Sequence, residues 1–342
     1  MSIFSNKILL ATDGSKDAEL AAKAAVDLSK RTGAELHVVH AWRPLPHYAY
    51  PSLVPEGYQP PYEEGARKIL EAQVGRIEEA GISVAEAHLV TGRPADAILD
   101  LGDQLGAGLI VVGSRGLGPV KRLLVGSVSE SIVHHAKCPV LVVRSGAGSW
   151  PPVRVVIGED LSEDAHSAAK LGITLAKLME AETLLVHTYE GMPPHPETLP
   201  QADRELYEAM VDKHLRQVES ALEERAAELE QAYDVGPQVR IVPGESAQVL
   251  AEIAEEGDGP SLLVVGSRGL GTSERMVIGS VSSKVLRAAG GPVLVCRPEH
   301  QTEHEEGRRR TAGKGTEPDS LSRSPLNGAE FCFAEGFPSL GV

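Results

Sequence analysis

Two stretches of the chain carry the same pattern of glycine and serine. The first reads GSRGLGPVKRLLVGSVSESIVHHA over residues 113–136, and the second reads GSRGLGTSERMVIGSVSSKVLRAA over residues 266–289. In both, nine residues separate the second glycine of GSRGLG from the glycine of GSVS. Glycine lacks the Cβ that keeps an oxygen-rich ligand away from the backbone. A helix that begins there offers unpaired N–H groups and the positive end of its dipole. The pattern predicts two phosphate-binding helix starts.

The alternative is that these glycines only serve turns, which is the usual role of a single glycine. Between the two copies, PVKRLLV has diverged from TSERMVI while the glycines have not, which indicates a shared physical demand. Ser127 and Glu130 fit a capping box, so we expect Ser127 to be the helix N-cap. Ser280 takes the same place in the second copy, where Ser283 replaces the glutamate.

An aspartate follows an apolar run early in each copy, as Asp13 in LLATDGS and Asp160 in VIGEDLS. In an open parallel sheet, ligands bind beyond the carboxyl ends of the strands, where the strand order reverses. A carboxylate there can accept hydrogen bonds from a ribose hydroxyl or an adenine amino group. The alternative role is a helix N-cap, and the two roles are compatible.

The elements that position these residues also occur twice. KILLATDGSKDAELAAKAA aligns with RVVIGEDLSEDAHSAAKLG at an offset of 147, and PVLVVR aligns with PVLVCR at an offset of 153. The order is kept throughout, which indicates a duplicated domain of about 145 residues. We place the first domain at 1–144, a linker at 145–152, the second domain at 153–298 and a tail at 299–342.

Each half alternates apolar runs with amphipathic stretches. The expected strands are 7–11, 35–40, 82–90, 109–113 and 139–143, then 153–158, 182–187, 237–242, 262–266 and 292–296. The expected helices are 15–32, 62–80, 94–105 and 127–136, then 162–180, 201–232, 245–256 and 280–289. This alternation predicts an α/β fold with parallel strands and right-handed crossovers. Wholly apolar runs such as LIVVG predict strands covered on both faces.

The composition restricts the classes of partner. The net charge of −15 disfavours nucleic acid and anionic membranes as general partners. Three cysteines without a CxxC pair favour a reducing compartment. The sequence contains no run of 18 apolar residues, so we expect no membrane span. We therefore expect a cytoplasmic protein. The polar, charged sequence after residue 298 predicts disorder; its end, AEFCFAEGFPSL, is either a docking peptide or an extension without function.

The glycine signature, the early aspartate, TGRPADAI and CPVLVVR together resemble the universal stress protein family over about 5–144 and 152–298. The resemblance implies a Rossmann-like fold with two tandem five-stranded parallel sheets in the order 3-2-1-4-5 and helices on both faces. It also implies that the last strands pair edge to edge as an internal pseudo-dimer, which covers an exposed apolar edge. Dimerisation of whole chains stays open. Members without the glycine motif do not bind nucleotide, so the resemblance places both halves in the ATP-binding branch, with Mg²⁺ held mainly by the phosphates.

By this resemblance, the two aspartates contact the adenosine end, the first two glycines of each copy lie along the ribose and phosphates, and GSVS holds the β- and γ-phosphates. In the second half GED replaces ATD, and the extra acid is expected to weaken that site. The residues assigned to the nucleotide are Ala11, Thr12, Asp13, His40, Gly113, Arg115, Gly116, Gly126, Ser127, Val128, Ser129, Gly158, Glu159, Asp160, His187, Gly266, Arg268, Gly269, Gly279, Ser280, Val281 and Ser282.

Several assignments keep an alternative. His40 and His187 either flank the adenine or are packed strand-end histidines; Arg115 and Arg268 either pair with phosphates or face solvent. The tyrosine- and proline-rich loop 41–62 is a lid, a partner surface or ordinary loop packing.

The sequence contains no GxSxG, HExxH or Walker A motif, so we expect no dedicated enzyme and predict no protein-bound metal. Three functions remain: an ATP-binding regulatory module, a slow ATPase or autokinase, and a nucleotide-independent scaffold.

Overall fold

The computed structural model describes residues 6–43, 61–115, 125–144, 150–189, 200–269 and 278–297. The predicted tail, most of the predicted linker and most of the tyrosine-rich loop lie outside these ranges, as does Gly116.

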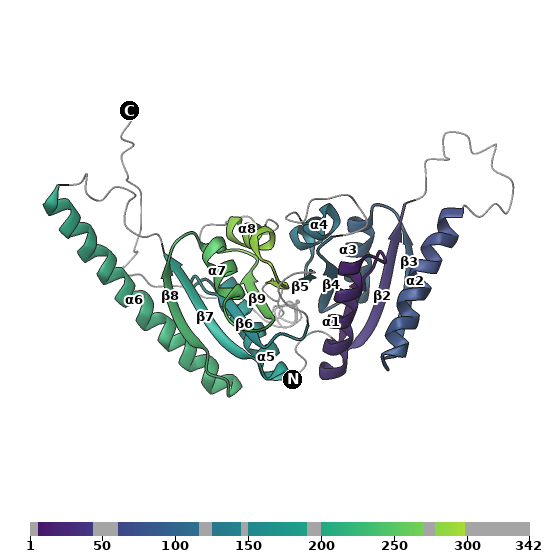
Figure 1. Cartoon of the computed structure of the whole chain (residues 1–342), viewed down its shortest axis with the longest axis horizontal. Helices are drawn as coiled ribbons and strands as arrows, with labels where there is room; N and C mark the ends of the chain where they lie inside the picture. Colours follow the sequence, from purple (N-terminus) through teal and green to yellow (C-terminus); the bar gives the residue numbers. More distant parts are fainter. Residues whose placement is uncertain are drawn as a thin grey trace, which may run out of the picture. The chain divides into compact units, whose positions relative to one another are not determined.

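The two halves have the same order of elements (Figure 1). The first half contains β1 (Lys7–Ala11), α1 (Lys16–Thr32), β2 (Glu35–Trp42), α2 (Pro61–Glu79), β3 (Val84–Thr91), α3 (Pro94–Leu105), β4 (Leu109–Gly113), α4 (Ser127–His135) and β5 (Val140–Val143). The second half contains β6 (Arg154–Gly158), α5 (Glu163–Met179), β7 (Glu182–Tyr189), α6 (Gln201–Tyr233), β8 (Gln238–Pro243), α7 (Ser246–Glu255), β9 (Ser261–Gly266), α8 (Ser280–Ala288) and β10 (Val293–Cys296).

The ten strands of the described ranges form one sheet, in the order β3-β2-β1-β4-β5-β10-β9-β6-β7-β8. Each half therefore has the predicted order 3-2-1-4-5. Strand pairs within a half are parallel, whereas β5 and β10 pair antiparallel, with Leu141 opposite Leu294. The predicted pairing of the last strands is confirmed. The chain order reverses between β1 and β4, and again between β6 and β9, which are the positions where ligands bind in such sheets.

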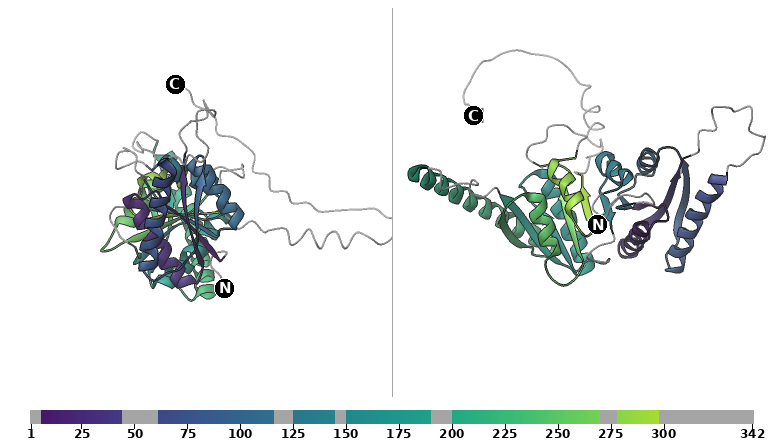
Figure 2. Two further views of the ribbon diagram at one scale, coloured as in Figure 1. Left: turned by 90° about the vertical axis from the view of Figure 1, so that its right-hand side faces the viewer. Right: turned by 45° about the horizontal axis from the view of Figure 1, so that its top comes forward.

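Helices cover both faces of the sheet (Figure 2). Along β1, Ile8 and Leu10 belong to one buried cluster with α1 and α2, while Leu9 and Ala11 belong to another with α3 and α4. In a sheet with one exposed face, every second residue of a strand is polar. Here both faces are covered, so the strands lack this polar alternation. This packing accounts for runs such as LIVV in β4, where all four side chains are buried.

Helix α6 has 33 residues, whereas its counterpart α2 has 19. Its buried residues, Val218, Leu222 and Leu229, lie in its second part, and the first part extends beyond the sheet (Figure 2). None of the helices in the described ranges has the length and apolar character needed to cross a membrane.

Two arginines tie the halves together in a reciprocal way. Arg144, just after β5, donates from Nη1 to the carbonyl of Ala289 and from Nη2 to that of Leu286, the latter at 2.6 Å. Arg297, just after β10, donates from Nη2 to the carbonyl of His134 at 2.6 Å. Each guanidinium thus binds carbonyl groups at the C-terminal end of a helix in the other half, where the helix dipole is negative.

Candidate functional site

The loop after β1 is held by its own side chains. Asp13 Oδ1 accepts from the backbone N–H of Ser15 at 3.0 Å. The N-cap of α1 is Ser15, whose Oγ accepts from Ala18 N at 3.3 Å and donates to the carbonyl of Arg115 at 3.1 Å. The interpretation of Asp13 as the N-cap is therefore wrong: its carboxylate closes a turn two residues before the N-cap, and Asp13 stays half-exposed.

The second half repeats this loop. Asp160 Oδ1 accepts from the N–H of Ser162 at 3.0 Å, and Ser162 caps α5 through Ala165 N at 3.2 Å. Gly269 lies directly against this aspartate, because a Cβ at that position would overlap Asp160 Oδ2. In the second half, the early aspartate and the glycine signature therefore lie side by side; their shared role in binding a nucleotide stays a prediction. The equivalent glycine of the first half, Gly116, lies outside the described residues.

Gly113 and Gly266, at the ends of β4 and β9, are glycines because a helix packs against them. A Cβ on Gly113 would lie 2.7 Å from the carbonyl carbon of Asp17 and from the backbone nitrogen of Ala18. A Cβ on Gly266 would lie 2.9 Å from the carbonyl carbon of Asp164. These distances are shorter than any side chain tolerates. The first glycine of each signature therefore lets the first turn of α1 or α5 approach the strand.

Helix α4 begins one residue earlier than the capping box predicted. Its N-cap is Gly126, with φ −68° and ψ 146°, and no side chain caps it. The backbone N–H of Gly126 donates to the carbonyl of Ser114 at 2.7 Å, and a Cβ there would lie 3.2 Å from the same oxygen. Ser127 is consequently the first helical residue, and the expected reciprocal bond with Glu130 does not form. Gly279 caps α8 in the same way.

The two serines of each GSVS tetrapeptide have different roles. Ser127 and Ser280 are exposed at the helix start. Ser129 is buried and donates from Oγ to the carbonyl of Gly113 at 2.7 Å; the matching bond from Ser282 to the last residue of β9 is 2.6 Å. The inner serine therefore joins the helix to the strand end, and the outer serine faces solvent. Val128 packs against the core, and Val281 is 40% exposed.

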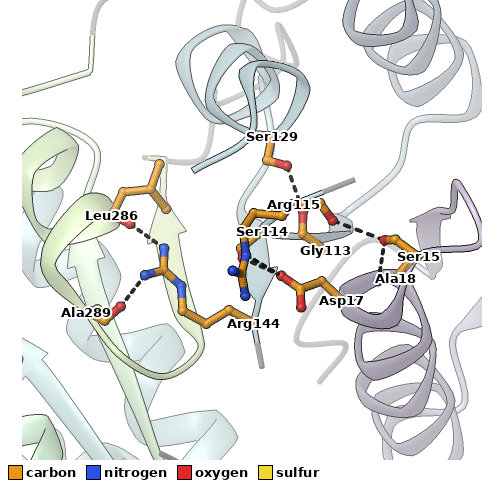
Figure 3. A network of polar contacts seen from close by, with 10 residues as sticks. All are labelled: Ser15, Asp17, Ala18, Gly113, Ser114, Arg115, Ser129, Arg144, Leu286 and Ala289. Atoms are coloured by element: carbon orange, nitrogen blue, oxygen red, sulfur yellow. Dashed lines mark hydrogen bonds and ion pairs between the residues drawn. The ribbon is translucent and has the colours of Figure 1, made fainter. Parts of the chain in front are cut away.

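Arg115 points into the protein, toward a buried carboxylate (Figure 3). Asp17 Oδ2 accepts from Ser114 Oγ at 2.7 Å and from Arg115 Nε at 3.2 Å. The side chain of Asp17 is 5% exposed and that of Arg115 is 21% exposed. The expected solvent-facing role is therefore not observed, because this ion pair fastens the end of β4 to the first turn of α1. A phosphate contact of Arg115 stays a prediction.

Asp164 in α5 makes the same connections, with Ser267 Oγ at 3.1 Å and Arg268 Nε at 3.2 Å. Sequence reasoning missed both aspartates. The available signal was the repeated S-x-D at residues 15–17 and 162–164, in which the serine is the cap and the aspartate is the ion-pair partner.

His40 and His187 each hydrogen-bond the backbone of the residue that precedes the early aspartate of their half. His40 is buried, and its Nδ1 lies 2.7 Å from the carbonyl oxygen of Thr12; Nδ1 of His187 lies 2.7 Å from that of Glu159. A carbonyl only accepts, so each Nδ1 carries the hydrogen. The packed strand-end role is therefore the one observed, and contact with an adenine stays a prediction.

The halves differ at the residue before the early aspartate. Thr12 Oγ1 hydrogen-bonds Gln73 of α2 at 3.2 Å. Its counterpart Glu159 is buried, accepts from the N–H of Leu161 at 2.7 Å and lies 3.4 Å from Arg225 of α6. Burial raises the pKa of Glu159 to about 7, with Arg225 opposing the shift. The extra acid thus lies in the interface with α6.

The residues preceding these positions are packing residues. Ala11 is buried in the core, and a Cβ on its counterpart Gly158 would lie 3.0 Å from Leu250 Cδ1 of α7.

The repeated elements and sites correspond to a known family. Residues 5–144 and 153–297 each match the model of the universal stress protein family. The chain belongs to the universal stress protein family.

Two relatives show the tandem and the single form. A universal stress protein of Mycobacterium tuberculosis is 30% identical over 305 residues, covering 85% of this chain and 96% of that protein. One of Thermus aquaticus is 43% identical over 141 residues, covering 40% of this chain and 97% of that protein. A solved structure of a universal stress protein from Archaeoglobus fulgidus superimposes with a TM-score of 0.59 at 25% identity, covering 86% of this chain and 97% of that one. This tandem universal stress protein is therefore similar to relatives that match both of its halves and to relatives that match one half.

Proposed function

We propose that each half of this tandem universal stress protein binds ATP, and that the nucleotide state regulates its contacts with other proteins in the cytoplasm. The observation that supports it most is the repeated helix start. In both halves a helix of nine residues begins at a glycine N-cap beyond a parallel strand, and its first serine is exposed. The first N–H groups of a helix have no partner within the helix, so they are suited to hold a polyanion.

The residues present fit this nucleotide. The backbone N–H groups of residues 127–129 and 280–282 would hold the β- and γ-phosphates, since the buried hydroxyls of Ser129 and Ser282 already donate to strand carbonyls. Asp13 and Asp160 would accept hydrogen bonds at the adenosine end. Gly269 lets the carboxylate of Asp160 lie against the backbone of the glycine signature, because a side chain there would overlap Asp160 Oδ2. Mg²⁺ would be bound through phosphate oxygens and would neutralise their charge.

We expect the first site to bind more tightly. Leu161 has a positive φ of 67°, whereas the corresponding residue of the first loop is Gly14, with φ 75°. A leucine in this conformation carries backbone strain of about 1–3 kcal/mol. The buried Glu159 adds a group whose charge is disfavoured there. Both features make the second loop the more strained support for a ligand.

Calorimetric titration with MgATP tests the proposal. We expect the wild type to bind, and Gly126→Val to lose the first site because its side chain would contact Ser114. Gly279→Val is the matched variant for the second site, and circular dichroism establishes that both variants fold. A wild type that takes up no ATP would refute the proposal.

A slow autokinase is the second candidate, with Ser127 as the acceptor. The exposed position of Ser127 favours it over Ser129, whose hydroxyl is buried and already bonded. This candidate requires phosphate release or a phosphoserine at residue 127 in the mass spectrum of protein incubated with MgATP. Absence of both, with ATP bound, leaves the regulatory role. Undiminished partner binding by a variant that no longer binds ATP would instead favour the scaffold function.

A further inference from the structure

Two histidines and a glutamate gather on β2 and β3, at the outer edge of the first half. His37 lies on β2, and Glu86 and His88 lie on β3, where Glu86 is the register partner of His37. His37 is buried, with 5% of its surface exposed. The side chain of His88 is 12% exposed and that of Glu86 is 65% exposed. The cluster therefore runs from the interior to the surface and is reachable by a small ion.

The distances within the cluster suit one metal ion. His37 Nδ1 lies 3.2 Å from His88 Nε2, and His88 Nε2 lies 3.8 Å from Glu86 Oε2. One donor atom from each residue lies within 4.8 Å of the others. Tetrahedral Zn²⁺ with bonds of about 2.0–2.1 Å separates its ligand atoms by roughly 3.3 Å. Small adjustments, mainly of the exposed glutamate, would bring all three onto one ion.

The other nitrogen of His37 supplies an independent indication. Nε2 is buried and has no hydrogen-bond partner among the described residues. Glu35 Oε2 lies 3.7 Å away, beyond hydrogen-bond reach. A histidine that binds a metal through Nδ1 carries its hydrogen on Nε2 and commonly donates it to a carboxylate. A metal at the cluster would therefore fix the tautomer of His37 and give Glu35 a role.

The second half shows that the fold does not require this cluster. In the register of β7 and β8, Leu184 pairs with Gln238 and Val186 pairs with Arg240. Leu184, Gln238 and Arg240 take the places of His37, Glu86 and His88, and they offer neither imidazole nor carboxylate. The same sheet forms with them, so the pairing of the two strands does not require the three polar residues of the first half.

We propose that His37, His88 and Glu86 bind one divalent late transition-metal ion of the Zn²⁺ class, with Glu35 as the carboxylate partner of His37. Solvent completes the coordination on the exposed side. The ion cross-links β3, the last strand of the sheet on that side, to β2. The site does not depend on the nucleotide sites.

The test uses the full chain without an affinity tag, stripped with a chelator and free of nucleotide. We expect titration with Zn²⁺ to show one ion bound at the cluster, Zn²⁺ to raise the melting temperature, and Co²⁺ to give the visible absorption of a tetrahedral complex. His88→Gln and Glu86→Gln should each weaken Zn²⁺ binding at least about ten-fold and remove the thermal shift.

His134→Gln with His135→Gln is the matched control, because it removes a neighbouring pair of histidine rings outside the cluster, and it should bind as the wild type does. If His88→Gln does not fold, Glu86→Gln decides, since its side chain is exposed. Wild type without Zn²⁺ uptake would overturn the proposal, as would uptake unchanged in Glu86→Gln or lost in the control.

Discussion

A negative charge added at the start of α4 should weaken ATP binding without lowering the stability of the fold. Ser127 is exposed and is the first residue of the helix. In Ser127→Asp the new carboxylate lies beside the helix N–H groups that we assign to the phosphates. Two unit charges 4 Å apart repel by about 1 kcal/mol in water and by about 4 kcal/mol at an effective dielectric constant of 20. For this exposed position we expect a loss of about 1.4–2 kcal/mol, which weakens ATP binding at the first site about 10- to 30-fold.

The same substitution should not destabilise the fold. An acidic side chain in the first turn interacts favourably with the helix dipole, by about 0.3–1 kcal/mol, so urea denaturation should show equal or higher stability. Ser127→Asn is the control, because it has the size of aspartate without the charge, and Ser280→Asp tests the second site in the same way. Calorimetry with MgATP reports the affinity. Unchanged affinity in Ser127→Asp would show that this helix start does not hold the polyanion.

Three further predictions concern the supports of the site. Asp17→Ala removes the buried acceptor of two bonds and should lower the free energy of unfolding in urea by about 2–4 kcal/mol; a loss below 0.5 kcal/mol would contradict the role of the ion pair. Gly113→Ala places a methyl group 2.7 Å from backbone atoms of α1 and should cost more than Gly126→Ala, whose contact is 3.2 Å; the reverse order in thermal melts would refute the packing argument. Burial raises the pKa of Glu159 from 4.5 to about 7, so between these pH values the folded chain retains a proton that the unfolded chain loses. The contribution of Glu159 to stability therefore falls as the pH rises through this range, by up to about 3 kcal/mol. In urea denaturation, Glu159→Gln should become gradually more stable relative to the wild type from pH 5 to pH 8, and a constant difference would contradict this prediction.

The sequence predicted the fold closely because both halves follow simple patterns. Runs such as LIVVG have no polar alternation, so they predict strands covered on both faces, and the structure places Leu109–Gly113 between β1 and β5 with every residue buried. The pairing of β5 with β10 was implied by the resemblance to the family, and it covers the apolar edge of each half.

The site was less predictable because several of its residues act through contacts that a local pattern does not contain. Ser127 fits a capping box by sequence, but Gly126 is the N-cap of the helix. The N–H of Gly126 donates to the carbonyl of Ser114, a contact that lies outside the local pattern. Asp17 resembles an ordinary first-turn acid, and its partners lie almost 100 residues later, with a separation of 97 for Ser114 and 98 for Arg115.

Glu159 illustrates the same limit. An acid beside the predicted ligand indicated a weakened site, but the sequence did not show that α6 supplies Arg225 to it. The structure shows that the contact of Thr12 with Gln73 of α2 in the first half is replaced by a contact of Glu159 with Arg225 of α6 in the second.

Native mass spectrometry of the full chain with MgATP tests the central claim most directly. The account predicts species with one and two bound nucleotides in the wild type, at most one in Ser127→Asp, and none at the same ATP concentration in the double variant Ser127→Asp with Ser280→Asp. A wild type that stays free of nucleotide, or a double variant that still carries two, would contradict the assignment of the two helix starts to the phosphates.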